Sequence, residues 1–119
     1  WLCDLERPIS LEEAKQKLAS LFPDRLADFW HGPEKIKRIG VCSGGGGGEY
    51  LYRGIKDHLD LYITGETSYS MAHDSVEYGL NIACVGHYAS ETFGVKALQA
   101  EVEAQFGVET AFFDNPTGL

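Results

Sequence analysis

Short apolar segments alternate with helical segments through the centre of this 119-residue chain, and this alternation constrains its fold more than any other feature. Residues 36–42, 59–63 and 81–85 are rich in apolar side chains, as buried strands are. Residues 49–58 and 68–78, which lie between them, are predicted to form helices. Strands that alternate with helices are typical of βαβ units, in which successive strands run parallel. The sequence therefore predicts an α/β fold with a largely parallel sheet and alternating helices.

The segments outside this central region complete the expected fold. Ser10 begins a capping box, in which a hydroxyl and a Glu three residues later bind the free N–H groups at a helix start. Pro23 ends the helix that follows. Residues 24–34 are expected to form a loop or short turn. Residues 90–106 are predicted to form an amphipathic helix with one apolar stripe, and residues 108–113 a final strand.

The composition limits the partners and the compartment of the protein. With 44% hydrophobic and 24% charged residues it is globular, so we expect residues 1–119 to form a single α/β domain. Eighteen acidic and ten basic residues give a net charge of −8, which disfavours nucleic acid and membrane surfaces as partners. The three cysteines lack zinc-site spacing and are expected to be reduced thiols, which favours a cytoplasmic location. Because the chain begins at Trp1 rather than Met, we expect it to be part of a longer polypeptide.

The third central strand is followed by His87 and, four residues later, by Glu91. Ligands of open α/β sheets bind at the carboxyl ends of the strands. Imidazole nitrogen and carboxylate oxygen are both ligands of divalent metals. His87 and Glu91 are therefore candidate metal ligands. A structural interpretation stands beside this one: Glu91 would complement the positive end of a helix dipole, and His87 would be an ordinary polar residue at a strand end.

The turns after the other two central strands also carry candidate functional residues. A glycine run follows the first strand, and the free N–H groups of Gly44, Gly45 and Gly46 could bind an anion. The run lacks the Lys and Ser/Thr of a phosphate-binding Walker loop, and close packing of strand against helix is the alternative explanation. Glu66 follows the second strand and is a candidate general base, a residue that orients a metal ligand, or a partner of a helix dipole.

Three motifs, taken together and in this order, resemble the C-terminal half of the Nif-three-like dinuclear-metal proteins, which are often labelled GTP cyclohydrolase I type 2 homologues. The motifs are Val-Cys-Ser-Gly-Gly-Gly at residues 41–46, Tyr-Ile-Thr-Gly-Glu at residues 62–66 and Gly-His-Tyr-Ala-Ser-Glu at residues 86–91. The resemblance covers residues 24–116. The combination of the three motifs is specific, whereas each motif alone would be a weak signal.

The resemblance implies one lobe of a two-lobed α/β protein that holds two divalent metals between its lobes, with His87 and Glu91 as ligands. Zinc, manganese or iron would suit such a nitrogen and oxygen ligand set. It also implies a ring-shaped homo-oligomer and a metal-dependent, hydrolase-like reaction on a small substrate such as a nucleotide, with Glu66 near the cleft. The other ligands of the family, a His-His pair and an Asp, belong to the N-terminal half, which this chain does not match. The alternative function is a non-catalytic module for oligomerisation or partner binding, with a structural metal or none.

Overall fold

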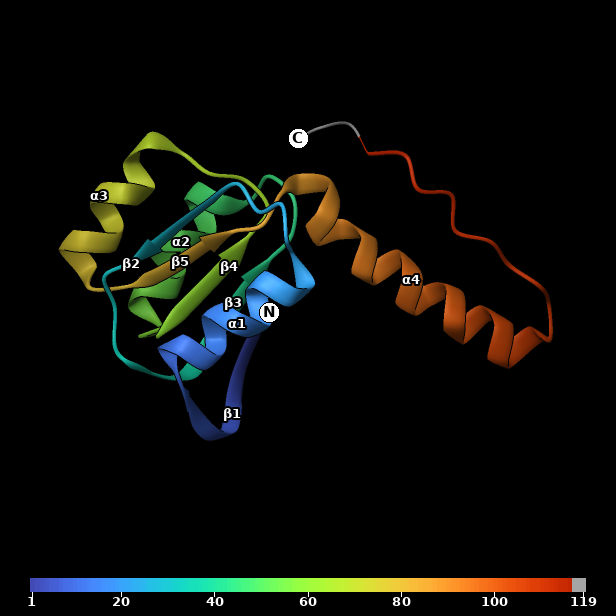
Figure 1. The fold of residues 1–119 in the computed structure, drawn as a ribbon, viewed down its shortest axis with the longest axis horizontal. Helices are drawn as coiled ribbons and strands as arrows, with labels where there is room; N and C mark the ends of the chain where they lie inside the picture. Colours follow the sequence, from blue (N-terminus) through green and yellow to red (C-terminus); the bar gives the residue numbers. More distant parts are fainter. Residues whose placement is uncertain (117–119) are drawn as a thin grey trace.

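A computed structural model describes residues 1–116 as a five-stranded sheet with helices on both faces (Figure 1). The strands are β1 (Leu2–Ser10), β2 (Ala27–Trp30), β3 (Lys35–Cys42), β4 (Leu61–Thr64) and β5 (Asn81–Cys84). The helices are α1 (Leu11–Leu21), α2 (Gly47–Lys56), α3 (Tyr69–Tyr78) and α4 (His87–Phe106). The α/β fold that the alternation predicts is confirmed.

The sheet is parallel at its centre and antiparallel at both edges. Its strand order is β1-β3-β4-β5-β2, and the central strands β3, β4 and β5 are parallel to one another. β1 pairs antiparallel with β3, and β2 pairs antiparallel with β5. The prediction of a largely parallel sheet is therefore confirmed for the centre, and its three carboxyl ends lie at one edge of the sheet.

The loop predicted for residues 24–34 contains the edge strand β2. Its four half-buried residues pair with β5, from Ala27 opposite Cys84 to Trp30 opposite Asn81. The prediction was wrong here because a segment of four residues carries little local strand signal, and its hydrogen-bond partner is far away in the sequence. The strand forms because β5 offers it a ladder of backbone groups.

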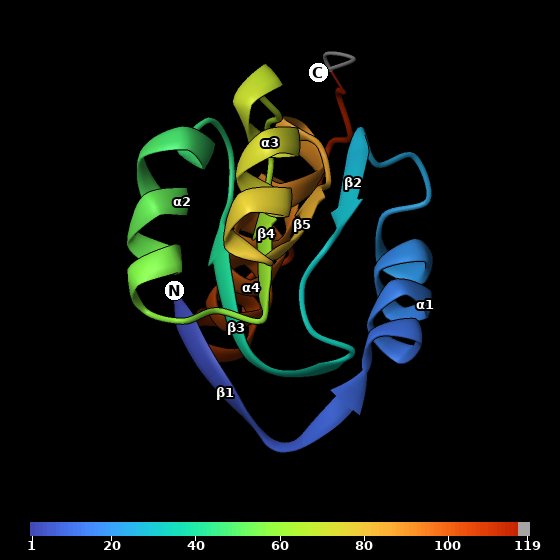
Figure 2. The same ribbon diagram turned by 90° about the vertical axis from the view of Figure 1, so that its left-hand side faces the viewer.

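Two apolar clusters, one on each face of the sheet, make up the core. The first lies under α1 and includes Leu11, Leu18 and Ile36. The second lies under α2 and α3 and includes Leu51 and Met71. Figure 2 shows the same division, with α1 on one side of the sheet and α2 and α3 on the other. The helices therefore cover both faces of the central strands. They do not cover the end of the sheet at which β3, β4 and β5 have their carboxyl ends.

The last helix leaves this packed body (Figure 1). α4 begins at His87, three residues before the predicted start, and none of its residues is buried. Within residues 1–116 the predicted apolar stripe packs against nothing that buries it: Val95, Leu98 and Phe106 are all more than half exposed. No helix in this part of the chain is both long and apolar enough to cross a lipid bilayer.

The strand predicted for residues 108–113 is absent from the structure. These residues follow α4 without regular secondary structure, and Phe113 is 85% exposed. A strand needs a neighbour to bind its backbone N–H and C=O groups. Among residues 1–116, no strand pairs with this segment. The prediction was therefore wrong for this chain, although the segment has an apolar composition that a strand could use.

Candidate metal site

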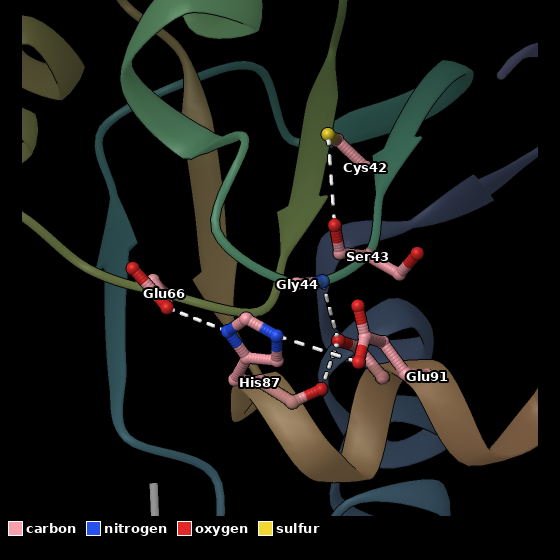
Figure 3. A network of polar contacts seen from close by, with 7 residues as sticks. Cys42, Ser43, Gly44, Glu66, His87 and Glu91 are labelled. Atoms are coloured by element: carbon pink, nitrogen blue, oxygen red, sulfur yellow. Dashed lines mark hydrogen bonds and ion pairs between the residues drawn. The ribbon is translucent and has the colours of Figure 1, made fainter.

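The candidate residues meet at the carboxyl ends of the three parallel strands, in the turns shown in Figure 3. Gly44 lies two residues beyond β3, and Glu66 lies two residues beyond β4. His87 is the first residue of α4, and Glu91 lies one turn further along the same helix. The parallel order of β3, β4 and β5 thus brings together residues that the sequence separates by more than forty positions.

The imidazole ring of His87 lies between two carboxylates. Its Nδ1 is 2.6 Å from Oε1 of Glu66, and its Nε2 is 3.3 Å from Oε2 of Glu91. Figure 3 shows the two carboxylates on opposite sides of the ring. All three side chains are partly open to solvent, with 40% of the His87 side chain exposed. Each carboxylate therefore has its own ring nitrogen as partner, and the cluster faces solvent.

The turns after β4 and β5 are bonded to each other, which fixes the distance between Glu66 and His87. The Val85 N–H donates to Thr64 O at 2.8 Å, and the Gly86 N–H donates to Gly65 O at 2.9 Å. Gly86 has a φ of 99°, a conformation that side-chain-bearing residues rarely adopt. The parallel ladder therefore continues past the last strand residues, and the positive φ of Gly86 lets the chain turn directly into α4.

Ser90 ties the glycine loop to the first turn of α4. Its Oγ accepts a hydrogen bond from the Gly44 N–H at 2.9 Å and donates one to the carbonyl of His87 at 2.8 Å. The loop and helix approach closely here, because a Cβ on Gly65 would lie 2.6 Å from Gly44 O and 2.7 Å from Ser90 Oγ. Ser90 was not among the predicted site residues. The one sequence feature that could have indicated it is a hydroxyl four residues after Gly86, the glycine between β5 and α4.

The glycine loop packs against the carboxylates. Gly44 has a φ of 66°, and a Cβ there would lie 2.5 Å from Oε1 of Glu91 and 3.3 Å from Nε2 of His87. A Cβ on Gly45 would lie 3.2 Å from Oε1 of Glu66. These contacts favour the close-packing explanation of the glycine run, because the carboxylates would repel an anion bound beside them. Anion binding by Gly44, Gly45 and Gly46 stays a prediction.

The carboxylates also set the charge of the ring. The hydrogen bond to Glu66 raises the pKa of His87 above its ordinary value, and the negative charges of Glu91 and Glu66 act in the same direction. Desolvation of the ring lowers this pKa and only partly offsets the rise. The cluster therefore attracts positive charge, in the form of a proton on the ring or of a cation.

The other histidines lie away from this cluster. His31 contacts the buried Ser75 through Nδ1 at 2.9 Å. His58 follows α2 with a φ of 55°, and His73 is exposed on α3. Within residues 1–116, no three His, Cys, Asp or Glu side chains converge on one point that could hold a metal ion. Any metal site here would therefore need ligands beyond His87 and Glu91.

A cavity of about 490 Å³ lies away from this cluster, between β1, β3 and α2, with Val41, Tyr50 and Arg53 in its wall. His87, Glu66 and Glu91 do not line it. The side chains of His87, Glu66 and Glu91 are instead partly exposed at the surface.

Comparison with known proteins places the chain in a family. Residues 1–118 match the family described as Duf34/NIF3 (NGG1p interacting factor 3). The chain is 38% identical to a Pyrococcus abyssi protein named "GTP cyclohydrolase 1 type 2 homolog", covering all of this chain and 47% of that protein. A protein of the same name from Deinococcus radiodurans is 37% identical, over 97% of this chain and 43% of its own length. The chain therefore belongs to the Duf34/NIF3 family.

A solved structure agrees with this assignment. The protein TTHA1606 from Thermus thermophilus superposes with a TM-score of 0.80 at 38% identity, covering 96% of this chain and 45% of that one. A structure described as "protein ybgI, unknown function" superposes with a TM-score of 0.85 at 26% identity, covering 98% and 47% of the two chains. The chain thus spans about half the length of the relatives it matches. The resemblance proposed from the three motifs is confirmed.

Proposed function

We propose that this chain supplies His87 and Glu91 as ligands to a divalent-metal site. In the intact protein that site would carry out a metal-dependent, hydrolase-like reaction on a small substrate such as a nucleotide. The observation that supports the proposal is the position of His87 Nε2, which lies 3.3 Å from a Glu91 oxygen while Nδ1 is held by Glu66.

The position of the proton on the His87 ring decides which nitrogen could bind a metal. A neutral imidazole has one N–H and one nitrogen with a free electron pair. The 2.6 Å contact at Nδ1 is the shorter of the two, and we infer from it that the neutral ring keeps its proton on Nδ1, towards Glu66. The free electron pair of Nε2 then faces Glu91. Two electron-rich atoms this close are stabilised by a cation between or beside them.

The separation of the two atoms fits one metal ion. Ligand nitrogen and oxygen atoms that each lie about 2.1 Å from a metal are about 3.0–3.4 Å apart at octahedral to tetrahedral angles. The observed separation of Nε2 and Oε2 is 3.3 Å. The absence of a side chain at Gly44 matters here too, because its Cβ would occupy the space beside Glu91. Two ligands do not complete a site, so the others would come from the remaining half of the protein or from a second copy.

The chemistry of such a site is that of a metal-activated water. A bound zinc, manganese or iron ion would lower the pKa of a water molecule and so supply a nucleophile near neutral pH. His87 and Glu91 would hold the ion at the end of the sheet. Glu66 would act as a base or would orient His87. The backbone N–H groups of Gly44 to Gly46 could contact an anionic substrate once a cation offsets the carboxylate charge.

A homo-oligomer in the cytoplasm is part of the same proposal. The exposed apolar residues of α4 support it, because Val95, Leu98 and Phe106 would be covered in a larger assembly. The same observation favours the second candidate function, a non-catalytic module for oligomerisation or partner binding with a structural metal or none. Removal of a structural metal by a chelator would lower stability or oligomer size, whereas removal of a catalytic metal would leave both nearly unchanged.

The first test is the metal content and zinc affinity of the 119-residue chain. We expect binding that falls at least tenfold in His87→Ala and in Glu91→Gln, because each removes one of two ligands. His73→Ala is the matched control, since this exposed histidine lies on α3, away from the cluster. Zinc that binds to the chain and binds equally well to His87→Ala would overturn the assignment of His87 as a ligand.

A further inference from the structure

We propose that Glu66 is a positioning residue, which holds the Nδ1–H of His87 and thereby presents Nε2 to the metal beside Glu91. This inference rests on the proposed function and assigns one of the roles that the sequence left open for Glu66. It follows from the order of the three side chains, in which the ring of His87 separates the two carboxylates (Figure 3).

The geometry speaks against the other roles of Glu66. Its Oε1 is engaged 2.6 Å from Nδ1. The proposed metal position adjoins Nε2, on the opposite side of the ring, where Glu91 and not Glu66 lies. A metal ligand or a base for a metal-bound water would have to reach that side. Glu66 is therefore placed to act on His87 and not on the metal or its water.

Two features of the fold restrict the position of the Glu66 carboxylate. The backbone of the turn that carries Glu66 is joined to the turn before His87, because the Gly86 N–H donates to Gly65 O at 2.9 Å. Gly45 lies close to the Glu66 carboxylate, since a Cβ on Gly45 would be 3.2–3.4 Å from the carboxylate atoms. The contact with His87 is thus one that the fold restricts, although both side chains are partly exposed.

Metal binding by only two ligands, His87 and Glu91, depends strongly on the orientation of the His87 ring. A histidine without a partner can place its proton on either nitrogen and can rotate its ring, so Nε2 faces the metal only part of the time. A carboxylate that accepts the Nδ1–H selects one tautomer and one ring orientation, and loss of such a partner typically weakens metal binding about 10–100-fold. Glu66 would supply this selection before the metal arrives.

The direct test is the tautomer of His87 in the metal-free chain, measured by ¹⁵N NMR at a pH where the ring is neutral. We expect the proton on Nδ1 in the unmodified chain and a mixture of tautomers in Glu66→Ala. Glu66→Gln should restore most of the Nδ1–H form, because its amide oxygen still accepts a hydrogen bond. Glu101→Ala, which removes an exposed carboxylate from α4 away from the cluster, should change nothing.

Zinc affinity, measured in the same variants, gives the second readout. We expect Glu66→Ala to weaken binding about 10–100-fold, Glu66→Gln to weaken it less, and Glu101→Ala to leave it unchanged. A proton on Nε2 in the unmodified chain, or an unchanged tautomer in Glu66→Ala, would overturn the positioning role alone. Unchanged zinc affinity in Glu66→Ala, with His87→Ala impaired, would also overturn only that role. Zinc affinity that is the same with and without His87 would overturn the proposed function itself.

Discussion

The two ends of the parallel sheet use polar side chains in opposite ways. At the amino end of β5, Asn81 is fully buried, and its amide accepts a hydrogen bond from the Gly32 N–H at 3.0 Å. The same amide donates to the carbonyls of Pro33 and Asp60 at 3.0 Å each. Just beyond the carboxyl end of β5, His87 is partly exposed between two carboxylates.

The two ends differ in the polar groups that remain available to bind a ligand. At the amino end the side chain of Asn81 bonds to backbone groups and is itself enclosed, so nothing remains available. At the carboxyl end the backbone groups are bonded mainly to each other and to Ser90, and the charged side chains stay open to solvent. We infer that the amino end serves stability and the carboxyl end serves binding. Three substitutions test this division.

The largest effect on stability is expected from Asn81→Ala. The substitution leaves the Gly32 N–H and the carbonyls of Pro33 and Asp60 without the partner that the fully buried Asn81 supplies. Unsatisfied groups of this kind should lower the free energy of unfolding by about 2–4 kcal/mol. Urea titration would measure the loss. Zinc affinity of the folded fraction should be unchanged, and a large fall in that affinity would contradict the division between the two ends.

A smaller loss is expected from Gly65→Ala at the carboxyl end. The new Cβ would lie 2.6 Å from Gly44 O and 2.7 Å from Gly44 N, which are backbone atoms that cannot easily move away. We expect the free energy of unfolding to fall by about 1–3 kcal/mol, as in an overpacked core. Zinc binding should fall with it, because the loop that moves also contacts Glu91.

Gly48→Ala is the matched control for this substitution. A Cβ on Gly48 meets nothing within 4 Å, and the residue lies in α2 with an ordinary φ. The alanine should raise the free energy of unfolding by about 0.5 kcal/mol through its helix preference and should leave zinc binding unchanged. If Gly65→Ala behaved like Gly48→Ala, the close contact between the turns would not hold in solution.

The sequence predicted much of this arrangement, because the alternation of strands and helices is a strong local signal. It placed β3, β4 and β5 in a parallel order, and this order alone brings Glu66, His87 and the glycine loop to one edge. The motifs then indicated the family. What connects these predictions is that each depends on residues close together in the sequence or on a general rule of sheet topology.

The remaining features depend on contacts that no local pattern encodes. β2 forms because β5 binds it, and residues 108–113 stay without a strand because they meet no partner within the described chain. Glu66 contacts Nδ1 of His87, and Glu91 contacts Nε2. This pairing depends on the side-chain conformations and on the hydrogen bonds that join the turns after β4 and β5. The hydrogen bond from the Gly44 N–H to Ser90 Oγ forms because the loop after β3 lies close to α4, and this closeness arises only in the folded chain.

The smallest loss of stability is expected from Ser90→Ala, and it tests whether the carboxyl end serves binding more than stability. The substitution removes the acceptor of the Gly44 N–H and the donor to the His87 carbonyl. Because the site is only partly buried, water can replace these bonds, and the free energy of unfolding should fall by about 1 kcal/mol or less. The loop would no longer be held against Glu91, so zinc affinity should fall several-fold. Ser90→Thr, which keeps a hydroxyl, should retain more of that affinity. A loss of stability as large as that of Asn81→Ala, with zinc binding unchanged, would show that Ser90 supports the fold and that the two ends are not divided as we infer.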